Sequence, residues 1–95
     1  MTGRHYTPPS QYKGEGEVWY QGERVATVQC MLGLFYEAAP VNSLPPVKGG
    51  SVQLAYGHIP SDGEELLLVC PEGRSLRFRA THKVGRVYRV TPLEQ

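Results

Sequence analysis

Apolar and polar residues alternate along much of the chain, which predicts β-strands with one buried face. The alternation is clearest over residues 12–20 and 75–81. Residues 24–37 form a longer apolar segment, in which Gly33 predicts a bulge or a bend. Three more strands are predicted, at 51–58, at 65–70 with apolar residues on both faces, and from 84 or 86 to 91.

Glycine and proline separate these strands. The 95 residues include 11 Gly and 8 Pro. Turn sequences at 21–23, 60–63 and 71–74 predict tight connections between neighbouring strands. Residues 39–50 contain three prolines and two glycines, so we expect a loop without regular structure there. Residues 1–11 show no periodicity and contain a Pro-Pro pair, which predicts a flexible, extended tail.

Short strands joined by short turns predict an all-β fold of five to six strands. A small, partly open antiparallel β-barrel with a monomeric core, or a small sandwich, fits this pattern. We expect a single domain over residues 12–95, because a chain of 95 residues buries one thin core. No run approaches the roughly 18 apolar residues of a membrane span, and residues 1–12 lack the apolar segment of a secretory signal. Size and cysteine usage therefore favour a cytoplasmic protein of bacterial or phage type.

The sequence contains no motif for catalysis or metal binding. The three histidines are scattered, and no HExxH, GxSxG, phosphate-binding loop or Cys/His ligand set occurs. We therefore expect a non-enzymatic protein that uses no cofactor and no metal. Cys30 and Cys70 are compatible with two buried thiols or with one disulfide, and their spacing leaves both open.

The charges are distributed unevenly, although the net charge is only +1. Residues 1–72 contain eight acidic and four basic side chains, whereas residues 73–95 contain six basic and one acidic. The first part of the chain is acidic and the last quarter is basic. The basic last quarter indicates an anionic partner, which the net charge alone does not reveal.

Arginines in the last quarter provide the candidate binding site. Arg77 and Arg79 are two residues apart, so both leave the same face of one strand. Arg86 or Arg89 joins them on the next strand, and the register decides which one. The candidate surface for a nucleic acid or another phosphorylated partner comprises Arg77, Arg79, Arg86, Tyr88 and Arg89, with Tyr88 and Tyr20 available to stack on bases.

A purely structural role for these arginines is the competing interpretation. If the barrel closed by pairing its first strand with its last, the arginines would lie opposite Glu15, Glu17 and Glu23. Cross-strand ion pairs would then account for both sets of charges without a ligand.

The second functional hypothesis is a protein-interaction or homodimeric module that uses a strand edge or the loop 39–50. Its candidate interface residues are Trp19, Leu44, Pro45 and Pro46. Trp19 is expected to be either a half-buried anchor at a barrel end or an exposed contact for a partner. Binding of a small ligand inside the barrel is less favoured, because side chains fill the interior of so small a barrel.

Overall fold

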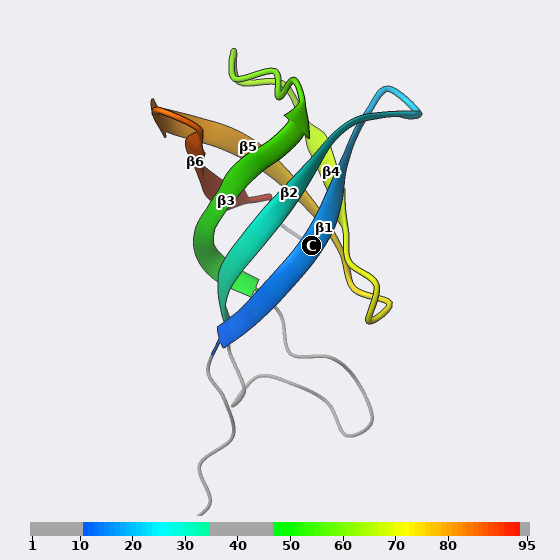
Figure 1. Ribbon diagram of the computed structural model, residues 1–95, viewed down its shortest axis with the longest axis vertical. Coiled ribbons are helices and arrows are strands. Elements are labelled where there is room, and N and C mark those ends of the chain that lie inside the picture. Colours follow the sequence, from blue (N-terminus) through cyan, green and yellow to red (C-terminus); the bar gives the residue numbers. More distant parts are fainter. Residues whose placement is uncertain (1–10, 35–46, 94–95) are drawn as a thin grey trace, which may run out of the picture.

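A computed structural model describes residues 11–34 and 47–93, which form a closed antiparallel β-barrel (Figure 1). This confirms the predicted small all-β barrel, with the ring of strands complete. The described residues contain six strands: β1 (Gln11–Tyr20), β2 (Glu23–Leu34), β3 (Val47–Gly57), β4 (Leu66–Val69), β5 (Ser75–Val84) and β6 (Val87–Pro92). No helix in these ranges is long and apolar enough to cross a membrane.

The strands follow one another around the barrel in the order β1-β2-β3-β6-β5-β4, and β4 closes the ring against β1. The neighbours β4-β1-β2-β3 form a Greek key. The first strand therefore pairs with the fourth, and the pairing of the first strand with the last, on which the competing interpretation of the arginines depends, is absent from the described strands. The segment between β3 and β4 returns the chain to the far side of β1, and its Ile59 is buried in the interior.

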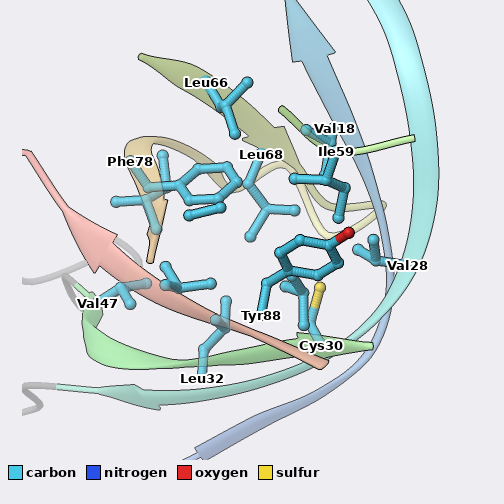
Figure 2. Packing of buried hydrophobic residues seen from close by; sticks show 14 of the residues in the cluster. Val18, Val28, Cys30, Leu32, Val47, Ile59, Leu66, Leu68, Phe78 and Tyr88 are labelled. Atoms are coloured by element: carbon cyan, nitrogen blue, oxygen red, sulfur yellow. The ribbon is translucent and has the colours of Figure 1, made fainter. Parts of the chain in front are cut away.

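Inward-facing residues of all six strands meet in one apolar core (Figure 2). The alternation predicted for β5 is confirmed, with Leu76, Phe78 and Ala80 buried and the arginines between them exposed. Tyr88 and Phe78 are the largest of the completely buried side chains. Each Å² of apolar surface removed from water stabilises the folded state by about 25 cal/mol, so this core is the main stabilising feature of the fold. The core consists of Val18, Ala26, Val28, Cys30, Leu32, Leu34, Val47, Val52, Ile59, Leu66, Leu68, Cys70, Leu76, Phe78, Ala80, Tyr88 and Val90.

Several strand boundaries differ from the prediction. Strand β1 already begins at Gln11, and β3 begins at Val47, so the last part of the predicted loop is strand. Gly50 explains why a glycine-rich stretch can pair there. It has φ 148°, and an added Cβ would lie 2.2 Å from the carbonyl oxygen of Met31 on β2. The interface residues predicted in the loop, Leu44, Pro45 and Pro46, lie outside the described residues.

Irregular pairing decides which face some side chains occupy. The register of β2 against β3 shifts next to Gly33, where the sequence predicts an irregularity, but the extra residue is Lys48 of β3. A second shift places Tyr56 opposite Thr27 and Leu54 opposite Val28, so Ala55 is the extra residue. Tyr56 is therefore turned outward and is 78% exposed, although simple alternation places it in the core with Val52.

Strand β4 is shorter and less enclosed than its apolar sequence predicts. It covers four residues, and Leu66 and Leu68 are buried while Leu67 is 36% exposed. The strand therefore has one buried face, like its neighbours, and the expectation that both faces are covered is wrong. A continuous apolar sequence shows that a strand could be covered on both faces, but it does not show whether another part of the chain packs against the outer face, and Leu67 is partly exposed there.

Candidate anion-binding face

The barrel brings part of the predicted site together on the outside of β5, β6 and β3. In the β5–β6 hairpin Arg79 lies opposite Thr91, and Thr81 lies opposite Arg89. On its other side Arg89 lies opposite Ser51 of β3. We call the outward residues of this region the basic face; they are Arg77, Arg79, Thr81, Arg89, Thr91 and Ser51.

The register settles which arginine joins the pair on β5. Arg89 lies in β6 with its side chain outward, diagonal to Arg79 across the hairpin. Arg86 lies in the turn before β6, where its Nε donates a hydrogen bond to the Leu54 carbonyl oxygen at 3.1 Å. Arg86 therefore flanks the basic face at the end of β3 and is not part of its centre.

Two of the arginines make contacts with the segment that leads into β4. The Arg77 Nε lies 3.1 Å from an oxygen of Glu65, but the two side chains are 58% and 54% exposed. Ion pairs this exposed contribute at most about 1 kcal/mol, because water screens them. The Arg79 Nε donates to the Gly63 carbonyl oxygen at 2.9 Å, which orients the guanidinium without neutralising it.

Arg89 is the exception among these arginines. It makes no ion pair or hydrogen bond with any residue that the structure describes. Its neighbours across the strands, Thr81 and Ser51, carry hydroxyl groups. The Thr81 and Thr91 hydroxyls form a hydrogen bond of 3.1 Å with each other. Strands β3, β5 and β6 contain no acidic residue, so no carboxylate on them can compensate the charge of Arg89.

Tyr88 is not part of this face. It is only 2% exposed, and its ring lies in the barrel interior (Figure 2). The Nζ of Lys83 lies 5.6 Å from the centre of that ring, a cation–π contact at the barrel end. The expectation that Tyr88 stacks on bases is wrong, because Tyr88 and Arg89 are consecutive in one strand and point to opposite faces.

The other proposed stacking residue, Tyr20, is half-buried against the core and accepts a hydrogen bond from Gln21. Burial and the nearby charge of Glu64 raise its pKa. Tyr20 ends β1, the strand that follows β4 around the ring and is not a neighbour of β5 or β6. It therefore does not extend the basic face.

The acidic side chains of β1 do not pair with the arginines of β5 and β6, as the competing interpretation of these charges required. Glu17 accepts hydrogen bonds from Arg24 at 3.2 Å and from the indole of Trp19 at 3.3 Å. Strand β4 separates β1 from β5, and strands β2 and β3 separate it from β6. Glu15 and Glu17 therefore do not compensate Arg77, Arg79 or Arg89.

Trp19 is half-buried on the outside of β1, between Arg24 and Leu67 on the neighbouring strands. This placement agrees with the half-buried alternative. The residues that sequence reasoning missed are Ser51, Thr81 and Thr91, which the pairing register reveals, and Tyr56, whose exposure depends on the bulge at Ala55.

Within the described ranges no group of three or more His, Cys, Asp and Glu side chains is arranged to hold a metal ion. The comparisons with known proteins gave no match to a protein family, to a curated protein or to a solved structure.

Proposed function

We propose that this protein binds nucleic acid through the phosphate groups, and that the basic face is the contact surface. Guanidinium groups form charge-assisted hydrogen bonds with phosphate oxygens, and Ser and Thr hydroxyls donate to the same oxygens. The basic face alternates these two kinds of group across three adjacent strands. A chain of phosphates fits such a surface better than a single phosphorylated ligand, because the basic face spreads across three strands.

The observation that carries this proposal is the position of Arg89. An exposed guanidinium between two hydroxyl residues, diagonal to a second arginine, is repelled by its neighbour and has no counter-charge among the described residues. A bound polyanion would remove that repulsion. Tyr56 and Arg86 add an exposed aromatic ring and a further cation at the end of β3, where an unpaired base could stack.

The direct test is a titration of fluorescently labelled oligonucleotides, single-stranded and double-stranded, with the purified chain at about 50 mM and about 200 mM salt. We expect binding at low salt that weakens at high salt. The double variant Arg79→Ala with Arg89→Ala should lose about tenfold or more in affinity, because two phosphate contacts disappear.

Arg24→Ala is the matched control. Arg24 is an exposed arginine like Arg79 and Arg89, but it makes an exposed ion pair with Glu17 and belongs to the β1–β2 hairpin. Its replacement should leave the affinity within about twofold of the unmodified chain, because only long-range screened charge is lost. Absence of binding at low salt, or equal losses in the double variant and in Arg24→Ala, would show that the basic face is not the binding surface.

A further inference from the structure

Exposed apolar side chains gather at the end of the barrel that adjoins the basic face. Val84 and Val87 lie opposite each other across the turn of the β5–β6 hairpin, and they are 78% and 40% exposed. Tyr56, near the end of β3, is 78% exposed. The hairpin turn and the end of β3 lie at the same end of the barrel, the upper end in Figure 1. We call Gln53, Tyr56, Val84 and Val87 the uncharged patch.

The uncharged patch continues the basic face along the same strands. On β6, Val87 and Arg89 are two residues apart and both point outward. The rise of an antiparallel strand separates them by about 7 Å. On β3, Gln53 lies opposite Val87 and Ser51 lies opposite Arg89. Phosphate-binding groups and uncharged side chains therefore form two adjacent rows on one outer surface.

Arg86 links the two parts of the uncharged patch. It lies in the hairpin turn next to Val87, and its Nε donates a hydrogen bond to the Leu54 carbonyl oxygen at 3.1 Å. The Leu54 amide donates in turn to the Arg86 carbonyl oxygen at 2.7 Å. These two bonds hold the turn against β3, two residues before Tyr56. A cation is therefore fixed where β3 meets the hairpin, within the uncharged patch.

The strands around the uncharged patch place no carboxylate beside it. Strands β3, β5 and β6 contain no acidic residue. On β2, the residues opposite Tyr56 and Gln53 are Thr27 and Gln29, which are uncharged as well. A polyanion that follows the basic face therefore reaches the uncharged patch without meeting a negative charge on these strands.

We propose that the ligand is a single-stranded nucleic acid, whose phosphates contact the basic face while its bases lie on the uncharged patch. This inference rests on the function proposed above and specifies its ligand. In a duplex the bases are paired and stacked on each other, so their faces do not reach Tyr56 or the valines. In a single strand, a base can stack on the Tyr56 ring or cover the two valines, and the Gln53 amide can bond to a base edge.

The test compares three labelled ligands of about 12 nucleotides by fluorescence anisotropy with the full chain at about 50 mM salt. They are a single strand, the same strand in a duplex, and a single strand of abasic sugar–phosphate units. We expect the base-bearing single strand to bind at least about tenfold more tightly than either of the other two, because only its bases can stack on the protein. Single strands of DNA and of RNA are compared, and the tighter one identifies the class of strand.

Substitutions in the uncharged patch test where the bases lie. The double variant Tyr56→Ala with Val84→Ala removes two side chains that are each 78% exposed, so the fold should persist, as circular dichroism can verify. Its affinity for the base-bearing single strand should fall at least about tenfold, while its affinity for the abasic strand stays within about twofold. Leu67→Ala is the matched control, because Leu67 is an exposed apolar residue on β4, away from the uncharged patch. It should leave both affinities unchanged.

The abasic strand separates a failure of this inference from a failure of the proposed function. Equal affinities for the base-bearing and abasic strands, or for the single strand and the duplex, would overturn the inference and leave phosphate binding by the basic face in place. Equal losses for the base-bearing and abasic strands in the double variant would do the same. Absence of binding of all three ligands at low salt would refute the proposed function, and this inference with it.

Discussion

The basic face and the β1–β2 hairpin are two outer surfaces of one barrel, and they differ in whether their charged side chains have partners of opposite charge. In the hairpin, Glu17 is bonded to Arg24 and to the Trp19 indole, so its charge is used locally. On the basic face, Arg89 has no partner among the described residues, and the strands around it contain no carboxylate. The comparison therefore singles out Arg89 as a charge that its described neighbours do not compensate, and this is why the proposed function rests on it.

The strand order keeps the two surfaces apart. Because β4 closes the ring against β1, the hairpin β5–β6 is separated from β1 by β4 on one side and by β2 and β3 on the other (Figure 1). The acidic side chains of β1 and the basic face therefore lie on two sides of the barrel, whereas Glu65 lies beside Arg77 and Glu72 beside Arg74. Pairing of the first strand with the last would have placed β6 beside β1 and favoured mutual neutralisation.

Charge reversal on the basic face should have the largest effect. In Arg79→Glu with Arg89→Glu, two attractive contacts become repulsive, so affinity for a single-stranded oligonucleotide should fall by at least about 100-fold at low salt. Reversal on the other side, Glu15→Lys, should change affinity by less than about threefold. A fluorescence anisotropy titration measures both. Similar changes of affinity in the two variants would show that the basic face does not bind nucleic acid more directly than the β1–β2 hairpin does.

Substitutions of Tyr56 and Tyr88 test which of the two rings is available to a nucleic acid on the outside of the barrel. Tyr56→Ala should weaken single-strand binding by about 1–3 kcal/mol if a base stacks on the exposed ring, with little change in the free energy of unfolding. Tyr88→Phe should leave affinity unchanged, because that ring is buried. Titration and urea denaturation of both variants measure these effects. Loss of affinity in Tyr88→Phe without loss of stability would contradict the assigned orientation.

Salt dependence separates direct phosphate contact from general attraction. If Arg89 contacts one phosphate, Arg89→Ala should reduce the slope of log affinity against log salt by about 0.7 for a single strand. Arg24→Ala should leave that slope unchanged, because Arg24 lies on the hairpin. Titrations at four salt concentrations give the slopes. Equal slopes for Arg89→Ala and the unmodified chain would remove Arg89 from the contact surface.

The smallest expected effect concerns the ion pair between Glu65 and Arg77. Glu65→Gln removes an attraction between two side chains that are more than half exposed, so the free energy of unfolding should change by less than about 1 kcal/mol. Affinity should rise by up to about threefold, because Arg77 is released for a phosphate. A fall in affinity on this substitution would contradict the expectation that Glu65 competes with phosphate for Arg77.

Alternation predicted the strands and the outward arginines because period-two patterning survives wherever pairing is regular, as it does in most of β5 and β6. The same alternation also indicates that Tyr88 cannot lie on the face of Arg89, since two consecutive strand residues point to opposite faces. Alternation could not predict the outward orientation of Tyr56, because nothing in the sequence marks Ala55 as a bulge. The closure of β1 against β4 was equally hidden. It depends on which distant strands pair, and no local pattern encodes that choice.

The glycines of β1 illustrate the same limit. Gly14 and Gly16 identify neither a turn nor a phosphate-binding loop. A Cβ on Gly14 would lie 2.8 Å from the Tyr12 hydroxyl, and one on Gly16 would meet the Cys30 sulfur. Both glycines make room for side chains that fold over β1. Cys30 on β2 and Cys70 after β4 lie on either side of this strand, an arrangement that their spacing in the sequence does not indicate.

Mapping of backbone amide chemical shifts during titration with a short single-stranded oligonucleotide is the most direct test of the proposed function. The account predicts that the shifts concentrate on β3, β5 and β6, are largest around Ser51, Thr81 and Arg89, and vanish at high salt. The β1–β2 hairpin should be unaffected. Shifts centred on that hairpin, or none at low salt, would contradict the claim that the basic face is a nucleic-acid-binding surface.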